Sequence, residues 1–130
     1  MRLPLFVASL AASAVTTVSA VAQEAAPPAE EGRYGAALAR MLGEIGWQRC
    51  PADIMGEALR TACTVQLPEL TPALANLGTI TSVSFVEAGE RPPQGRIEAH
   101  RVEFSGGHAM IWIVGGEQNG RFDILYPVGE

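Results

Sequence analysis

Apolar residues change their spacing at Gly78, and this change limits the chain to few architectures. Between about Arg33 and Gly78 they recur every three or four residues, as on one face of a helix. After Gly78 they alternate with polar residues, as in strands with one buried face. Helices followed by consecutive strands predict an α+β domain, in which N-terminal helices pack on one face of a curved, mainly antiparallel four-stranded sheet.

Three helices are expected before Gly78. The first covers 33–46, ends at Gly46 and carries one apolar face, made of Tyr34, Leu38, Met41, Leu42 and Ile45. The second begins after an N-cap at Asp53, and it is less regular because it contains Gly56 and several β-branched residues. The third is short, since Thr71 caps it, Pro72 lies in its first turn and Gly78 ends it.

Four strands are expected around 80–87, 96–105, 108–115 and 121–128, with the loop "AGERPPQG" between the first two. A two-residue turn at Gly106 and Gly107 would align the second and third strands so that one apolar face contains His100, Val102, Phe104, Ala109, Ile111 and Ile113. The hairpin at "GEQNG" would extend this face to Phe122, Ile124 and Tyr126. Only a loop with an odd number of residues would break it.

In this register the two histidines lie on opposite faces of the sheet. His100 and Tyr126 look into the interior beneath the helices, and Glu98 is two residues from His100. His100, Tyr126 and Glu98 are therefore the candidate ligand-binding residues. The alternative for His100 is a hydrogen-bonded residue at the end of a strand, because a catalytic base first needs a reachable proton.

The outer face of the sheet would carry His108 together with a candidate partner-binding patch of Arg101, Met110 and Trp112. Arg101 would lie roughly opposite Trp112, where a cation–π contact is worth about 0.5–1 kcal/mol. An exposed apolar patch of this kind is typical of a protein-binding surface. The alternative is that a second layer of the same chain covers it.

The first 22 residues have the pattern of a secretory signal peptide. One Arg precedes an uncharged stretch from Leu3 to Val15, and small residues follow. Cleavage fits after Ala20 or after Ala22, and the second site has Ala at both critical positions. A membrane anchor is the alternative, although Thr and Ser residues interrupt the apolar run. We expect export to the periplasm or the extracellular space, a flexible lead-in over 23–32, and one domain over 33–130 with no membrane span.

The charge balance excludes several classes of function. All nine basic residues are Arg, and fourteen residues are acidic. Nucleic-acid binding needs clustered cations, so no nucleic-acid partner is expected. The lack of Lys also excludes Schiff-base and Ser–Lys chemistry.

Cys50 and Cys63 are the two cysteines of the chain. In an exported protein they are expected to form a disulfide, which would contribute about 3 kcal/mol for a loop of this size. The alternatives are a redox pair or a metal site. Both are disfavoured, because the spacing is not C-x-x-C and the two histidines lie far along the chain.

No reaction signature is present. The chain has no G-x-S-x-G motif, and "SGGH" and "VGGEQNG" are hairpin turns rather than phosphate-binding loops. We therefore expect no catalytic residue, no metal and no cofactor.

The stretches "LANLGTITSVSFVE" and "HRVEFSGGHAMIWIVGGEQNGRFDILYP" resemble the closing half of small secreted domains of the NTF2-like (cystatin-like) superfamily. The shared features are a short helix ending in Leu-Gly, a V-x-F strand before a Gly turn, and a Trp strand before a Gly hairpin. The resemblance covers about 74–127 and implies helices packed into a curved sheet around a cone-shaped cavity. It implies no catalytic residue, because the front half, with its cysteine pair, departs from the enzymatic members.

Two functional hypotheses follow. The first is a non-catalytic secreted or periplasmic binding module, which takes a small apolar molecule or another secreted protein. The second is a small enzyme that uses Glu98 and His100 as an acid–base pair over an interior pocket, with Tyr126 as a hydrogen-bond donor. The absence of a reaction signature favours the binding module.

Overall fold

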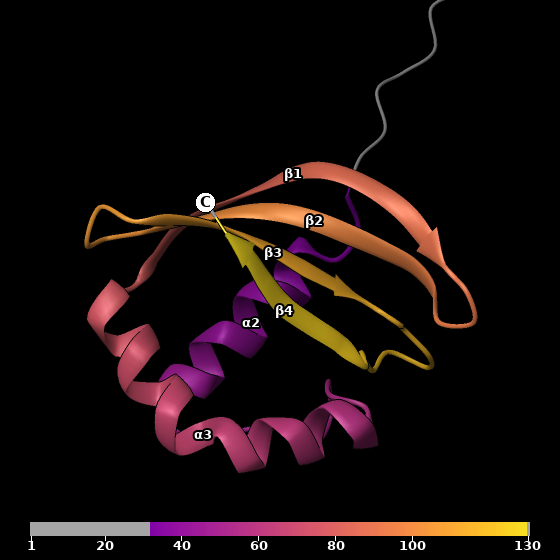
Figure 1. Cartoon of the computed structure of the whole chain (residues 1–130), viewed down its shortest axis with the longest axis horizontal. Helices are drawn as coiled ribbons and strands as arrows, with labels where there is room; N and C mark the ends of the chain where they lie inside the picture. The colour runs from indigo at the N-terminus through magenta and orange to yellow at the C-terminus, as the bar shows by residue number, and fades with distance from the viewer. Residues whose placement is uncertain (1–31, 130) are drawn as a thin grey trace, which may run out of the picture. The chain divides into compact units, whose positions relative to one another are not determined.

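The computed structural model describes residues 32–129. The predicted signal peptide and nearly all of the predicted lead-in lie outside these residues. Within them, two helices precede four strands, in the order α2 (Gly35–Gly46), α3 (Glu57–Leu77), β1 (Ile80–Arg91), β2 (Gly95–Phe104), β3 (Ala109–Gly115) and β4 (Ile124–Gly129) (Figure 1). The predicted α+β class is therefore confirmed.

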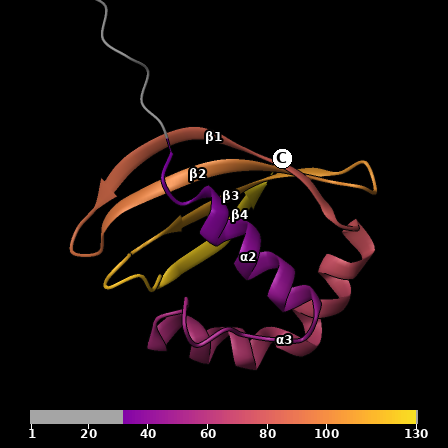
Figure 2. The same cartoon turned by 180° about the vertical axis from the view of Figure 1, so that it is seen from behind.

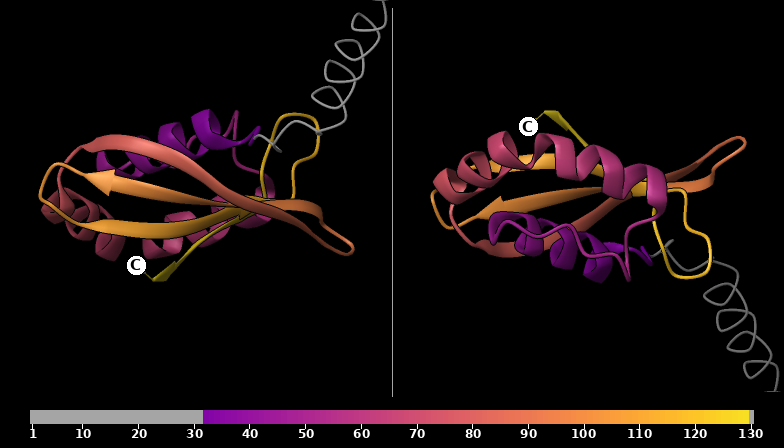
Figure 3. Two further views of the ribbon diagram at one scale, coloured as in Figure 1. Left: turned by 90° about the horizontal axis from the view of Figure 1, so that it is seen from above. Right: turned by 90° about the horizontal axis from the view of Figure 1, so that it is seen from below.

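The four strands form one antiparallel sheet in the order β1-β2-β3-β4, so each strand pairs with its neighbour in sequence. The sheet curves over both helices, which lie on the same side of it (Figures 1 and 2). Seen from below, α2 and α3 run along opposite sides of this face (Figure 3). The core lies between the two layers, and its most deeply buried members include Leu38, Met41, Met55, Val102 and Val114.

The predicted first helix is confirmed as α2. Leu38, Met41, Leu42 and Ile45 are buried on one side of it. Burial of an aliphatic side chain of this size contributes about 1.5–3 kcal/mol, so this face holds the helix against the sheet.

The second and third predicted helices form a single helix, α3, which passes through Pro68 and Pro72. A break was expected because an interior proline lacks the N–H for the helical hydrogen bond and crowds the preceding turn. The helix bends along its length instead (Figure 1), as helices that contain proline commonly do. Thr71, the predicted cap, donates its hydroxyl to the carbonyl oxygen of Ile45 at 2.7 Å and so ties this part of α3 to α2.

Helix α3 also begins later than predicted, because Gly56 rather than Asp53 is its N-cap residue. The Asp53 carboxylate pairs with Arg40 of α2 at 2.8 and 2.9 Å. Asp123 supplies the capping carboxylate, which accepts a hydrogen bond from the N–H of Leu59 at 3.3 Å. A Cβ at Gly56 would lie 2.2 Å from Asp123 Oδ1, so a side chain there would displace the capping group.

The strand limits differ from those predicted by more than one residue in two places. β1 continues through part of the predicted loop to Arg91 and leaves a turn at 92–94 before β2. β4 begins at Ile124, and Phe122 before it forms an isolated parallel bridge with Met55. This bridge ties the connection between α2 and α3 to the edge of the sheet.

The predicted register between β2 and β3 is wrong by one residue. Phe104 donates its N–H to the carbonyl oxygen of His108 at 2.9 Å, and three residues lie between them, so the loop has an odd length. Gly107 in this loop has φ +91°. Three-residue hairpin loops commonly contain one residue with positive φ, and this residue is often glycine. The N–H of Gly106 also donates to the carbonyl oxygen of Leu77 at 3.0 Å, which anchors the loop to the end of α3.

The corrected register places every side chain of β3 on the face of the sheet opposite to the predicted one. His100 pairs with Trp112, and Val102 pairs with Met110, so these four share the helix-facing side. Ile111 and Ile113 take the other face. Ile113 pairs with Tyr126 as expected, but both now lie away from the helices.

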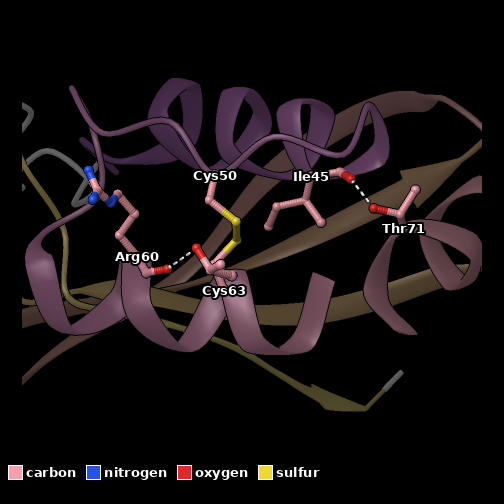
Figure 4. The surroundings of a disulfide bond; sticks show 6 residues. Ile45, Cys50, Arg60, Cys63 and Thr71 are labelled. Carbon is pink, nitrogen blue, oxygen red and sulfur yellow. Dashed lines mark hydrogen bonds between the residues drawn. A yellow bond between two sulfur atoms is a disulfide. The ribbon is translucent and has the colours of Figure 1, made fainter. Parts of the chain in front are cut away.

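The predicted disulfide between Cys50 and Cys63 is confirmed, with the two Cα atoms 6.1 Å apart. It joins the connection after α2 to the first half of α3 (Figure 4). Across residues 32–129, no helix is both long and apolar enough to cross a bilayer.

Candidate functional site

The carboxylate of Glu98 is the centre of a buried polar cluster on the helix-facing side of β2. Its side chain is 0% exposed. Oε1 accepts hydrogen bonds from the N–H of Tyr34 at 3.0 Å and from His100 Nε2 at 2.8 Å. Oε2 accepts from Arg96 Nε at 2.8 Å, and the N–H of Arg33 lies within 3.0 Å of both oxygens. The cluster thus joins the residues before α2 to the sheet.

These contacts keep Glu98 ionised. Burial by itself raises the pKa of a carboxyl group, because it removes the charge from water. Here the hydrogen bonds from His100, from the N–H groups of Arg33 and Tyr34, and from Arg96 outweigh that effect, and they lower the pKa of Glu98 from 4.5 to about 2. At neutral pH Glu98 is therefore a negatively charged acceptor.

The charge of Glu98 determines where His100 carries its proton. An ionised carboxylate only accepts hydrogen bonds, so the proton shared by Glu98 Oε1 and His100 Nε2 lies on Nε2. The other ring nitrogen, Nδ1, is buried and has no hydrogen-bond partner in the described part of the chain. In the neutral imidazole this nitrogen carries a lone pair.

Two glycines allow the chain to pass close to the His100 ring. A Cβ at Gly32 would lie 3.0 Å from Cε1 of His100 and 2.6 Å from Cδ1 of Phe85, which leaves no room for a side chain. A Cβ at Gly35 would lie 3.3 Å from Cε1 and 3.6 Å from Nδ1. Phe85 contacts the ring edge-on, with the centroids 5.7 Å apart. The imidazole is thus held on several sides.

A cavity of about 500 Å³ lies beside His100, between the start of α2 and strand β1. It is lined by Gly32, Arg33, Gly35, Ala36, Ala39, Val83, Phe85 and His100. The Cβ position at Gly35, 3.6 Å from Nδ1, is also 3.7 Å from Cγ1 of Val83. The Cε1–Nδ1 edge of the ring therefore lies close to Gly35, which is itself a residue of the cavity wall.

A second cavity, of about 670 Å³, lies at the other end of α2. It is lined by Ala39, Leu42, Gly43, Gly46, Trp47, Leu74, Ala75, Gly78, Thr79, Ile80, Phe104 and Ser105. Ala39 lines both cavities. Together they follow one side of α2 from its first turn to its last.

Of the three predicted ligand-binding residues, the structure brings two together. Glu98 and His100 are in direct contact on the helix-facing side. The Tyr126 side chain is not with them, because the corrected register places it on the opposite face. There its hydroxyl is 2.6 Å from Arg91 Nη2, and the Arg91 guanidinium lies 5.5 Å from the ring centroid.

The predicted partner-binding patch is not assembled. Trp112 is 5% exposed and belongs to the core, and Met110 packs against the same core. Arg101 stays on the outer face, where it pairs with Glu103 instead of contacting Trp112. The indole N–H of Trp112 is a second buried polar group without a partner among the described residues.

Sequence reasoning missed the contribution of residues 32–35 to the site. They supply two backbone donors to Glu98 and two glycines against His100, although they precede these residues by more than 60 positions. The two glycines of "GRYG", just before the first apolar helix face, could have indicated that another residue packs closely against this stretch. Nothing local in the sequence shows that this residue is His100.

The arrangement combines a polar ring atom of fixed orientation with a cavity whose wall contains apolar side chains and Arg33. In the described domain, no three His, Cys, Asp or Glu side chains lie together so as to hold a metal ion. Comparison with protein-family models, with curated proteins and with solved structures gives no significant match.

Proposed function

We propose that this domain is a non-catalytic binding module of an exported protein, and that it holds a small, mainly apolar molecule beside His100. The observation that carries the proposal is Nδ1 of His100, which is buried without a partner in the described domain and belongs to a side chain that lines a cavity of about 500 Å³. Buried polar atoms of folded proteins are nearly always hydrogen-bonded. A ligand that donates to Nδ1 would satisfy this atom.

The proton on Nε2 restricts the chemistry of the ligand. With this proton on Nε2 and no second proton on the ring, Nδ1 only accepts a hydrogen bond, so a matching ligand presents a hydroxyl or an N–H group. The rest of the cavity wall combines glycine, alanine, Val83 and Phe85, which suit an apolar body, with the exposed Arg33. Specificity would then depend on the hydrogen bond at Nδ1 together with the apolar contacts of Val83 and Phe85.

The same contacts support binding over the alternative acid–base enzyme. A general acid or base works best with a pKa near the operating pH. The pKa of Glu98 is about 2, so this residue does not exchange protons near neutral pH. Among the described residues, the cavity wall at His100 contains no Ser, Thr or Cys that could serve as a nucleophile.

One feature favours a second candidate function. Glu98 orients His100 as a carboxylate orients the histidine of a catalytic triad. In an enzyme of this design, Nδ1 of His100 would remove a proton from the bound substrate, and Glu98 would be its positioning residue. Chemical conversion of a ligand, seen as a new mass after incubation with the protein, would favour this second candidate.

Two glycines of α2 provide a matched pair of variants for the test. A Cβ at Gly35 would enter the space beside Nδ1, whereas a Cβ at Gly43 would meet nothing within 4 Å. Alanine is favoured over glycine in a helix by about 0.5–1 kcal/mol, so neither Gly35→Ala nor Gly43→Ala is expected to unfold the domain. Only Gly35→Ala narrows the proposed site.

The measurement is an NMR titration of ¹⁵N-histidine-labelled protein with butan-1-ol and N-methylacetamide. We expect the Nδ1 resonance of His100 to shift in the wild type and in Gly43→Ala, with binding about tenfold weaker in Gly35→Ala. The exposed His108 serves as the internal control. An unchanged His100 resonance, or equal affinity in the two variants, would contradict the proposal.

Native mass spectrometry of protein purified from its own host gives a complementary test. A small molecule that stays bound to the domain would support the proposal. A co-purifying polypeptide in its place would instead identify the domain as a protein-binding module.

We also propose that the domain is a distant member of the NTF2-like superfamily and that it is exported. Helices on one side of a curved antiparallel sheet support the first proposal. The disulfide, a bond typical of oxidising compartments, supports the second. Cell fractionation, followed by the N-terminal sequence of the mature protein, tests export, and the expected start is Gln23.

A further inference from the structure

We infer that the ligand is an elongated, uncharged single-chain amphiphile, whose head donates a hydrogen bond to His100 and whose chain extends along α2 toward Trp47. This inference rests on the proposed function, because it extends the same site. Its starting point is the second cavity, of about 670 Å³, which shares Ala39 with the cavity at His100.

Small residues along one side of α2 make room for such a chain. Gly35, Ala36, Ala39, Gly43 and Gly46 recur at helical spacing, and each of them lines one cavity or both. Helix α2 has 12 residues, which corresponds to a length of about 18 Å. Figure 2 shows this helix beneath β1 and β2, which supply much of the opposite wall. The space is therefore long and narrow.

The two ends of this space differ in chemistry. Near the start of α2, the unpartnered Nδ1 of His100 offers the one buried polar contact among the described wall residues of that cavity. Near the end of α2 the wall is mainly apolar, with Leu42, Leu74, Ile80 and Phe104. Trp47 is 75% exposed at this end. A molecule with one polar end and an apolar chain matches this distribution.

The hydrogen-bonding chemistry at His100 selects a hydroxyl head. A hydroxyl group donates to Nδ1, whereas an ionised carboxylate has no proton to donate. The charge of Glu98 does not decide this, because Arg96 pairs with it at 2.8 Å. An ammonium head would also donate, but Arg33, which lines this cavity, carries the same charge.

The first experiment measures the affinity of the full-length protein for butan-1-ol, hexan-1-ol, octan-1-ol and decan-1-ol, and for the matching alkanoates. Burial of each added methylene is expected to tighten binding about three- to fourfold until the groove is filled. Each alkanol is expected to bind more tightly than the alkanoate of the same length. Tighter binding of the alkanoates would overturn the assignment of an uncharged head.

The second experiment blocks the junction of the two cavities with Ala39→Leu. Leucine is a good helix former, so this change preserves α2 while its side chain fills the shared space. Ala58→Leu is the control, because Ala58 is exposed on α3 and lines neither cavity. We expect Ala39→Leu to remove the gain in affinity from chain length, whereas Ala58→Leu should behave as the wild type.

The indole N–H resonances of the two tryptophans report where the chain goes. Decan-1-ol is expected to shift the resonance of Trp47, whereas butan-1-ol should leave it unchanged. If butan-1-ol binds at His100 but chain length adds no affinity, or if Trp47 does not respond to decan-1-ol, the inference fails and the proposed function stands. If no alcohol shifts His100, the proposed function itself fails.

Discussion

His100 and His108 show how strongly the surroundings of a residue determine its energetic role. His100 is 3% exposed and bound to Glu98, whereas His108 is exposed beside the hairpin loop. We expect His100→Ala to lower the free energy of unfolding by about 1–3 kcal/mol, because it removes a donor from a buried carboxylate. His108→Ala should stay within about 0.5 kcal/mol of the wild type. Chemical denaturation of both variants decides this, and equal losses would contradict the placement of His100.

The pKa of Glu98 predicts how stability depends on pH. Because the pKa falls from 4.5 to about 2 on folding, the unfolded chain binds the proton more tightly than the folded domain. The stabilisation by ionised Glu98 is complete above about pH 4.5, and it is lost as the pH falls toward 2. The loss is on the order of 3 kcal/mol.

Carboxyl ¹³C NMR of the folded protein measures this titration directly. We expect a midpoint near pH 2 for Glu98, and a midpoint near pH 4 would refute the prediction. Asp53 is a useful comparison, because its hydrogen bond with Arg40 also lowers its pKa although the pair is exposed. Asp53→Asn should therefore change the acid stability much less than Glu98→Gln.

At the scale of elements, the disulfide makes the connection between α2 and α3 a major contributor to stability. The bridge closes a loop with a sequence separation of 13, and Cys63 is buried in the core. Cys63→Ala is expected to cost about 2–5 kcal/mol, as is usual for a native disulfide of a small domain. Denaturation of Cys50→Ala should give a similar loss, and the intact mass after alkylation should show no free thiol in the wild type.

Helix α2 could be predicted from sequence with the right end and a start two residues too early, because four apolar residues at helical spacing define its buried face. The limits of α3 could not be predicted in this way. Pro68 and Pro72 have the local properties of a helix break, but contacts such as the Thr71 hydrogen bond to Ile45 come from the tertiary fold. The same holds for the start of α3, where the capping carboxylate belongs to Asp123 near the other end of the domain.

At the scale of the whole molecule, strand alternation could place His100 on the helix-facing side, since this depends only on β2 and on where the helices pack. The partners of His100 depend on contacts between distant segments. The backbone N–H groups that bind Glu98 belong to Arg33 and Tyr34, which lie 65 and 64 residues earlier in the chain. Likewise, the position of Trp112 depends on one extra residue in the loop between β2 and β3. The local sequence pattern therefore predicts the face on which His100 lies, whereas its neighbours in the site follow only from the tertiary fold.

The last prediction tests the corrected register through the two tryptophans. Trp112 is 5% exposed between the sheet and the helices, whereas Trp47 is 75% exposed. Trp47→Phe should therefore leave one buried indole, with blue-shifted emission and little quenching by iodide. Trp112→Phe should leave an exposed indole that iodide quenches readily, and it should also destabilise the core. Had the hairpin loop contained two residues, as sequence alone suggested, Trp112 would lie on the outer face. Strong quenching of the Trp47→Phe variant would contradict the corrected register, because it would mean that Trp112 lies on the face opposite His100.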